Sequence, residues 1–105
     1  MLMATTDHLS EYKISKTLGL VRGSSIRAKH LGRDIGAGLK SLVGGELRGY
    51  SELLVESREE ALNRMIEAAE KLNADAIVGI RFSSSQIMSG AAEMLVYGTA
   101  VKIEK

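Results

Sequence analysis

The sequence predicts an α+β fold of two layers, in which one long helix covers a three-stranded sheet. Three observations predict it: a long stretch with helical periodicity over residues 50–73, an alternating stretch before it over residues 12–23, and two stretches rich in Ile and Val after it, over residues 75–83 and 94–104. The element order is therefore β-α-β-β. With 105 residues, 45% of them hydrophobic, the chain is expected to form one domain over residues 1–105.

Residues 50–73 form the predicted long helix. Glutamates occupy the side opposite its apolar arc, so we expect that side to face water. Ser51 is the predicted N-cap, and Asn73 is the predicted left-handed residue that ends the helix. The apolar arc comprises Leu54, Val55, Ala61, Leu62, Met65, Ile66, Ala68, Ala69 and Leu72.

Arg58 interrupts this pattern, because it projects near the middle of the apolar arc. In one interpretation its aliphatic stem lies on the core while the guanidinium reaches water. In the other it is a buried or interfacial cation bonded to a carboxylate, with Asp34 and Asp75 as candidate partners. We predict a polar network of Arg58 and Asp34 beneath a short helix that precedes the long one.

The chain before the long helix contains a loose start and one strand. Residues 1–10 show no clear period and are expected to be loosely held, with Thr5 and Thr6 as a candidate short edge strand. Residues 12–23 alternate between apolar and polar side chains and predict the first long strand. A bend at Gly23 would carry this strand on to Ile26.

Residues 29–45, KHLGRDIGAGLKSLVGG, predict a short glycine-rich helix. Glycine inside a helix costs about 1 kcal/mol relative to alanine, so this helix would need close packing against another backbone. Gly44 and Gly45 are predicted to end it. The segment lacks the lysine and hydroxyl spacing of a P-loop and the strand–turn spacing of a dinucleotide fingerprint. Its helical stripe consists of Leu31, Ile35, Leu39 and Leu42.

The last two strands carry apolar side chains on both faces. In residues 75–83, alternation places Ala76, Val78, Ile80 and Phe82 together on one face. Residues 84–93 are expected to form a loop of small residues before the third long strand. Because one helix buries only one face of a sheet, we expect a second copy of the chain to cover the other face and predict a homo-oligomer.

Composition limits the classes of function. The formal net charge is only +1, divided between a basic stretch, residues 11–48, and an acidic one, residues 49–75. The aromatic content of 4% argues against nucleic-acid binding, which usually needs stacking side chains and more basic charge. The absence of cysteine removes disulfides and thiolate zinc sites, and no apolar run has membrane length. A cytoplasmic protein without a membrane partner is expected.

Four segments together resemble the YbjQ-like family of small prokaryotic proteins: TLGLVRG at residues 17–23, RDIGAGLKSLVGGEL at 33–47, SREEALNRMIEAAEKLNADAIVGIRF at 57–82 and GTAVKI at 98–103. The resemblance implies a subunit like that of dodecin, with strand order 1-3-2. It also implies a closed ring, typically a pentamer, in which short extra strands join neighbours. The family is labelled as heavy-metal-binding, which implies a divalent or heavy metal ion as cofactor but supplies no ligand motif that maps onto this sequence.

His30 and Asp34 are the candidate metal ligands. They are four residues apart and would share a face of the short helix. Two ligands are too few for a tight site unless a symmetric ring repeats them. The alternative is that His30 is a surface residue beside a basic stretch.

The preferred hypothesis is a non-enzymatic oligomer that binds a small anionic ligand or a metal between subunits. Basic residues in or beside the glycine-rich segment favour an anion. One alternative is a scaffold without a ligand, in which the glycines serve subunit packing. A second is an enzyme of unknown reaction, although the run Ser83–Ser85 has no recognisable histidine partner. The candidate ligand-binding residues are His30, Arg33, Asp34, Lys40 and Arg58, and the wider basic set adds Arg22, Arg27 and Lys29.

Overall fold

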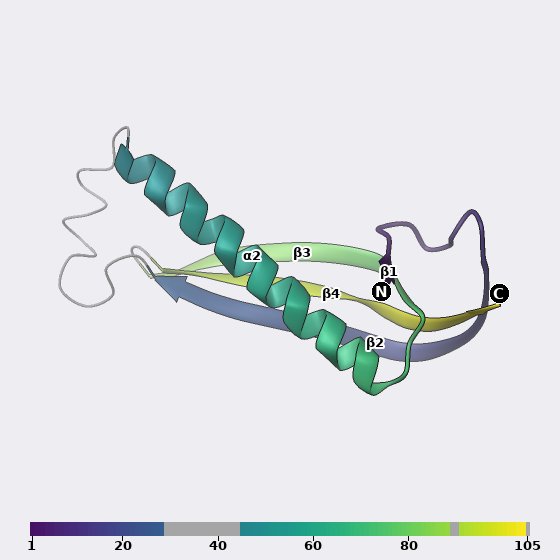
Figure 1. The fold of residues 1–105 in the computed structure, drawn as a ribbon. Helices are drawn as coiled ribbons and strands as arrows, with labels where there is room; N and C mark the ends of the chain where they lie inside the picture. The colour runs from purple at the N-terminus through teal and green to yellow at the C-terminus, as the bar shows by residue number, and fades with distance from the viewer. Residues whose placement is uncertain (29–44, 89–90, 105) are drawn as a thin grey trace.

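The computed structural model describes residues 1–28, 45–88 and 91–104. Its elements are β1 (Leu2–Met3), β2 (Lys13–Ala28), α2 (Gly45–Lys71), β3 (Ala76–Met88) and β4 (Ala91–Glu104). The strands form one mixed sheet in the order β1-β3-β4-β2, with β1 parallel to β3 and the other neighbours antiparallel. Figure 1 shows α2 crossing one face of this sheet, which makes the two layers of the fold.

The three long strands lie in the predicted order, but the described sheet has four strands rather than three. The fourth, β1, comes from the N-terminal segment, for which the sequence predicts loose order and a candidate edge strand at Thr5 and Thr6; the strand lies at Leu2–Met3 instead. This segment follows the outer edge of β3: Ala4 N donates to Ile77 O (3.0 Å) and Gly79 N donates to Thr6 O (2.8 Å). Unpaired backbone groups of β3 therefore order a stretch that has no hydrophobic period of its own.

The helix α2 begins at Gly45, five residues before the predicted start at Tyr50. Ser51 lies inside the helix, so its prediction as N-cap is wrong. Residues 46–48 are Glu, Leu and Arg, which are good helix formers and extend the helix toward its N-terminus. Gly45 begins this helix rather than ending a shorter one. The rest of the predicted glycine-rich helix lies outside the described residues.

The C-terminal end of α2 follows the prediction. Asn73 has a φ of 61°, and the Ala74 N–H donates to Ala69 O (3.1 Å). This bond from a residue to the carbonyl five positions earlier is the Schellman arrangement, which satisfies a carbonyl of the last turn. Asn73 thus turns the chain back toward β3.

The main core lies between α2 and the strands β2 and β4. Gly23 of β2 lies directly beneath the helix, where a Cβ atom would collide with Ala61 O and Met65 N. The absence of a side chain at Gly23 therefore allows close contact between the strand and the helix. The buried members of this core are Val21, Ala61, Met65, Ala69, Ile77, Ile80, Met94, Val96 and Ala100.

A β-bulge in β3 changes which side chains share a face. The register with β4 shifts between Val78 and Arg81, and Gly79 has a φ of 63°. As a result Ile77 and Ile80 both lie in the core beneath α2, while Val78 belongs to a cluster on the opposite face. The predicted single face of Ala76, Val78, Ile80 and Phe82 is therefore wrong, because one extra residue reverses the alternation.

Residues 84–88 and 91–93 do not form the predicted loop. Ser84 pairs with Met94, and Ser85 pairs with Glu93, so β3 and β4 continue as a hairpin toward residues 89–90, which are outside the described chain. Pairing in the sheet overrides the weak strand propensity of serine and glutamine. A loop that closes over a ligand is therefore absent from residues 84–88 and 91–93.

The described residues cover the face of the sheet opposite α2 at one end only. There Ala76, Val78 and Val101 pack with Leu9 and two further aliphatic side chains, Ile14 and Ile103. Toward the hairpin no part of the chain that the structure describes covers this face, and we call that part the open sheet face. It comprises Leu20, Arg22, Ser24 and Ile26 of β2, Glu93, Leu95 and Tyr97 of β4, and Arg81, Ser83 and Ser85 of β3.

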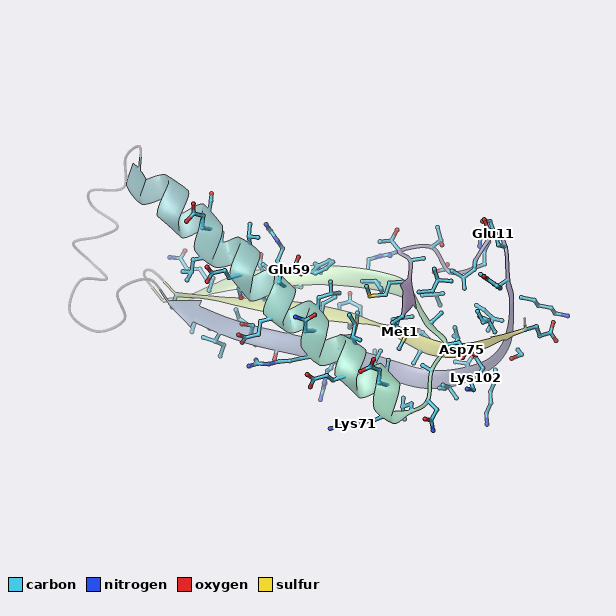
Figure 2. The ribbon with its side chains drawn as sticks, viewed as in Figure 1. Met1, Glu11, Glu59, Lys71, Asp75 and Lys102 are labelled. Carbon is cyan, nitrogen blue, oxygen red and sulfur yellow. The ribbon has the colours of Figure 1, made fainter. Side chains whose placement is uncertain are left out.

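Asp75 joins the end of α2 to β4. Its Oδ2 accepts a hydrogen bond from Ile103 N (3.0 Å), and its Oδ1 lies 3.8 Å from Lys102 Nζ, which also donates to Asn73 O (2.7 Å). Figure 2 shows Asp75 and Lys102 near one another beyond the C-terminal end of the helix. This carboxylate therefore fixes the crossing from the helix to the sheet.

We expect Asp75→Ala to lower the free energy of unfolding by about 1–2 kcal/mol, because the half-buried Ile103 N–H loses this acceptor. Asp75→Asn keeps an acceptor oxygen and loses only a partly exposed ion pair, so we expect a loss below about 1 kcal/mol. Urea unfolding followed by circular dichroism measures both. Equal losses in the two variants would show that the charge, and not the backbone hydrogen bond, is the stabilising element.

Candidate functional site

Two arginines flank a tyrosine on the open sheet face. In the strand register Arg22 of β2 lies opposite Tyr97 of β4, and Arg81 of β3 lies opposite Tyr97 from the other side. Directly opposed residues in antiparallel strands project to the same face, and neighbouring strands are about 4.8 Å apart. The three side chains therefore form one row across the sheet. All three are exposed, Tyr97 to 39%.

Arg81 is held at one end of this row by the N-terminal segment. Its Nη1 donates to Thr5 O (2.8 Å) and to Ile80 O (2.9 Å). A guanidinium has five N–H donors, and these two bonds use Nη1 only, so Nε and Nη2 keep donors for a ligand. The row thus combines three groups: the anchored guanidinium of Arg81, the phenol hydroxyl of Tyr97, and the guanidinium of Arg22 at the end of a long aliphatic stem.

A cavity of about 500 Å³ lies where the row meets the outer edge of β2. Arg22 lines it from the sheet, and Arg64 lines it from α2. The Arg64 guanidinium donates to Ser24 O and lies 2.8 Å from Glu60 Oε1. The remaining residues that line the cavity are Gly23, Ser24, Glu93 and Leu95.

Glu60 determines the position of the Arg64 side chain. Its Oε1 accepts a hydrogen bond from Ser25 Oγ (2.9 Å), and this serine is 1% exposed beneath the helix. Ser57, also buried, donates a long hydrogen bond to Ser25 O (3.5 Å). Because Glu60 compensates much of the Arg64 charge, Arg22 is the cation of this cavity with the most freedom to bind an anion.

Most residues predicted for the site fall outside the described chain. His30, Arg33, Asp34 and Lys40 all belong to residues 29–44, so the metal and anion predictions on them stay predictions. Arg58 is the one predicted site residue that the structure describes.

Arg58 is exposed on α2, so it is not a buried cation; that it is an interfacial cation stays a prediction. Asp75, one of its two candidate partners, lies beyond the other end of the helix, and the 13 residues from position 58 to the helix end at Lys71 span about 20 Å. The long aliphatic stem lets the guanidinium reach water from within an apolar arc. The pairing of Arg58 with Asp34 stays a prediction.

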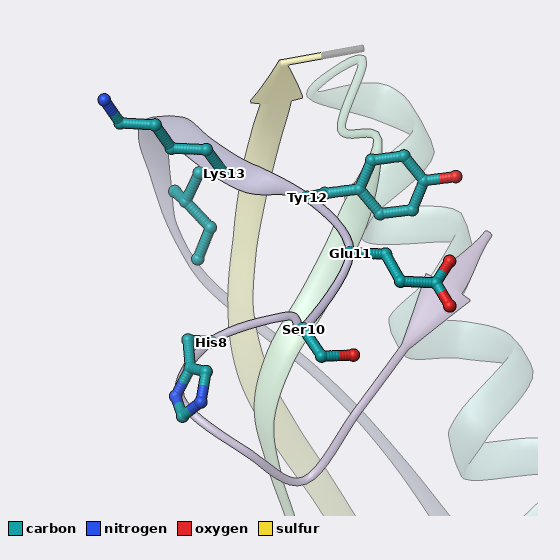
Figure 3. A pocket seen from close by; sticks show the side chains of 6 residues that line it. His8, Ser10, Glu11, Tyr12 and Lys13 are labelled. Atoms are coloured by element: carbon teal, nitrogen blue, oxygen red, sulfur yellow. The ribbon is translucent and has the colours of Figure 1, made fainter.

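The N-terminal loop forms a second cavity, of about 520 Å³, lined by His8 and residues 10–14. Figure 3 shows the Glu11 carboxylate and the Tyr12 ring pointing to one side of this loop, while His8 points to the other. His8 and Glu11 are therefore not arranged as a pair of metal ligands. Within residues 1–28, 45–88 and 91–104, no group of three His, Asp or Glu side chains is placed to hold a metal ion.

The row of Arg22, Tyr97 and Arg81 was not recognised from the sequence as a site. Alternation alone places Arg81 on one face of its strand, but only the register of the hairpin brings it opposite Tyr97. The bulge at Gly79 also has to be known, because it determines which face Arg81 occupies. Tyr97, the one aromatic residue of β4, was the available signal.

No helix among the described residues is both long enough and apolar enough to cross a membrane.

Comparison with known proteins identifies relatives along the whole chain. Residues 1–104 match a family described as "Putative heavy-metal-binding". A UPF0145 protein of Methanosarcina acetivorans is 61% identical over 103 residues, which cover 98% of this chain and 97% of the relative. A UPF0145 protein of Thermotoga maritima is 56% identical over 105 residues, 100% of this chain and 99% of the relative.

A solved structure supports the fold. A crystal structure of a protein of unknown function from Pediococcus pentosaceus, of the DUF74 family, aligns with a TM-score of 0.65 over 99% of this chain and 98% of that chain. At 18% identity this likeness concerns the fold alone. The match over residues 1–104 and the identities of 61% and 56% show that this chain belongs to the YbjQ-like family of UPF0145 proteins, as its sequence motifs predict.

Proposed function

We propose that this chain is a non-enzymatic protein that assembles into homo-oligomers and binds a small anionic ligand on the open sheet face. The row of Arg22, Tyr97 and Arg81 carries the proposal. Two guanidinium groups with a hydroxyl between them offer several donors to one anion, and no carboxylate stands in the same row. The cavity beside Arg22 gives such a ligand room.

Exposed aliphatic side chains support the assembly part of the proposal. Leu20 is 67% exposed and Ile26 is 64% exposed, both on the open sheet face of β2. Burial of such side chains contributes roughly 25 cal/mol per Å² of apolar surface removed from water. A second copy that covers this face would also place the anion between subunits. The ring of five that the family resemblance implies belongs to this part of the proposal.

The description of the family favours a metal ion as ligand, but the described residues are not arranged to bind one. They bring no three carboxylate or imidazole groups together, and the sequence has no cysteine for a soft metal. His30 and Asp34 stay the predicted metal ligands. The proposal therefore concerns the anion, and a scaffold without any ligand is the alternative that the experiment distinguishes.

We expect Arg22→Gln to weaken the binding of inorganic phosphate about 10-fold or more, because one charge-assisted hydrogen bond contributes roughly 1.5–3 kcal/mol. Titration calorimetry with inorganic phosphate measures the affinity, and native mass spectrometry measures the assembly. The matched control is Lys71→Gln, which removes an exposed cation of the last turn of α2 and should change neither quantity.

Arg33→Ala tests the predicted contribution of the glycine-rich segment in the same two measurements. A ligand-binding residue would change phosphate retention and leave the assembly intact. Native mass spectrometry can show a wild-type oligomer whose mass is a whole multiple of the chain mass, with no bound species. If calorimetry then also shows no binding of phosphate, the protein is a scaffold and the anion hypothesis fails. If Arg22→Gln dissolves the oligomer, Arg22 has a structural role in assembly and the proposed site loses its main residue.

A further inference from the structure

Glu93 is the only carboxylate among the described residues that line the cavity beside Arg22. Its side chain is half-buried and projects from β4 to the open sheet face. The second cation of the cavity, Arg64, is already paired with Glu60. In the part of the chain that the structure describes, neither Arg22 nor Glu93 forms an ion pair or a side-chain hydrogen bond. The cavity therefore presents one cation and one carboxylate that are both available to a ligand.

The strand register keeps these two charges apart. Arg22 lies opposite Tyr97, and Glu93 lies four positions before Tyr97 in β4, on the same face. At about 3.4 Å per residue, the two backbone positions are about 14 Å apart along the sheet. Leu95 lies between them, opposite Ser24, and also lines the cavity. A direct ion pair would require both long side chains to extend over Leu95, and an exposed pair gains too little to compensate that loss of side-chain entropy.

We propose that the anionic ligand of this cavity also carries a protonated amine, so that its anionic group binds Arg22 and its ammonium group binds Glu93. This inference rests on the proposed function, because it specifies the ligand of the same site. A carboxylate beside an anion site repels a plain anion. An ammonium group on the ligand compensates that charge and supplies three N–H donors to the carboxylate oxygens.

The residues between the two charges indicate the form of the ligand. Leu95 offers apolar surface, so a carbon chain is the linker that fits between the anionic group and the amine. The side chains of Arg22 and Glu93 cover part of the separation themselves, and a linker of about two to four carbon atoms spans the rest. A short aminoalkyl phosphate is the simplest molecule of this class, and the cavity of about 500 Å³ has room for it.

Two probes with the same carbon skeleton test the inference: 2-aminoethyl phosphate, which has the amine, and ethyl phosphate, which lacks it. Titration calorimetry on the wild-type protein should show that 2-aminoethyl phosphate binds about 10-fold or more tightly than ethyl phosphate, because a charge-assisted hydrogen bond replaces a repulsion. A third probe, 2-hydroxyethyl phosphate, has a donor without a charge and should bind like ethyl phosphate.

Glu93→Gln should abolish the preference by moving the two affinities in opposite directions. It removes the partner of the amine, which weakens the binding of 2-aminoethyl phosphate about 10-fold. It also removes the repulsion, which strengthens the binding of ethyl phosphate by a few-fold. The matched control is Glu70→Gln, which removes an exposed carboxylate near the end of α2 and should change neither affinity. Circular dichroism checks that both variants fold, and if Glu93→Gln does not, the three probes on the wild type decide alone.

Equal wild-type affinities for 2-aminoethyl phosphate and ethyl phosphate would overturn the inference. An affinity for 2-hydroxyethyl phosphate as high as that for the amine would also overturn it, since Glu93 would then recognise a donor and not a charge. So would a Glu93→Gln protein that keeps the preference. All three results leave the proposed anion site intact where Arg22→Gln still weakens every probe. If the wild type binds none of the probes and no inorganic phosphate, the proposed function itself fails, and this inference fails with it.

Discussion

Gly23→Ala is expected to have the largest effect of a glycine-to-alanine substitution among Gly19, Gly23, Gly79 and Gly98, with a loss of about 3 kcal/mol or more in the free energy of unfolding. The added Cβ would collide with Ala61 O and with Met65 N, both backbone atoms of α2. Backbone atoms inside a helix cannot move alone, so the whole helix would have to rise from β2. That displacement would open the core along its length.

Gly98→Ala is the control for this prediction, since it places the same methyl group on the neighbouring strand. There the new Cβ would lie 2.8 Å from Ile77 Cγ2 and 3.1 Å from both Ile80 Cγ1 and Val78 O. The nearest atom belongs to a side chain and the one backbone atom is farther away than those at Gly23, so we expect a smaller loss of about 1–3 kcal/mol. Urea unfolding measures both variants. If Gly23→Ala is as stable as Gly98→Ala, the contact between helix and strand is looser than the structure indicates.

Met65→Ala is expected to lower the free energy of unfolding by about 2–5 kcal/mol, because it leaves a cavity in the centre of the main core. Met65 is 0% exposed and packs between α2 and the sheet. A domain of this size has a total stability of about 5–15 kcal/mol, so the variant would be close to unfolding at ordinary temperature.

Met3→Ala is the matched control, because it removes the same atoms from a side chain that is 37% exposed. We expect its loss to stay below about 1 kcal/mol. Urea titrations of both variants, with the helical signal as the readout, give the comparison. A small loss in Met65→Ala would mean that neighbouring side chains collapse into the vacated space. A large loss in Met3→Ala would show that β1 stabilises the subunit more than its length suggests.

Hydrophobic periodicity predicted the large elements because each is determined locally. The apolar arc of residues 50–73 and the Asn73 turn depend on neighbours in the sequence, and both appear in the structure. The position of the fourth strand at Leu2–Met3, rather than at Thr5 and Thr6, and the long hairpin were not predicted, since their residues are ordered by pairing with distant backbone. Ser84 and Gln86 have no strong preference for a strand, and the register of β4 places them in one.

The candidate site was harder to predict than the fold. Arg22 and Arg81 are 59 positions apart in the sequence, and only the shared neighbour Tyr97 brings them into one row. Arg58 was singled out because it interrupts an apolar arc, but a long flexible side chain can leave such an arc without needing a partner. Whether a charged side chain is exposed depends on which faces of the sheet stay uncovered. That is determined only when all the strands have paired.

The bulge at Gly79 makes the face of every later side chain in β3 depend on one unpaired residue. Val78 lies opposite Thr99 and Arg81 lies opposite Tyr97, so two residues of β3 oppose Gly98 alone. If position 79 joined a regular ladder, the register beyond it would move by one residue, and Arg81 would lie opposite Val96 on the face beneath α2. The two arginines would then stand on opposite faces of the sheet, so the row depends on the left-handed backbone that glycine adopts at position 79.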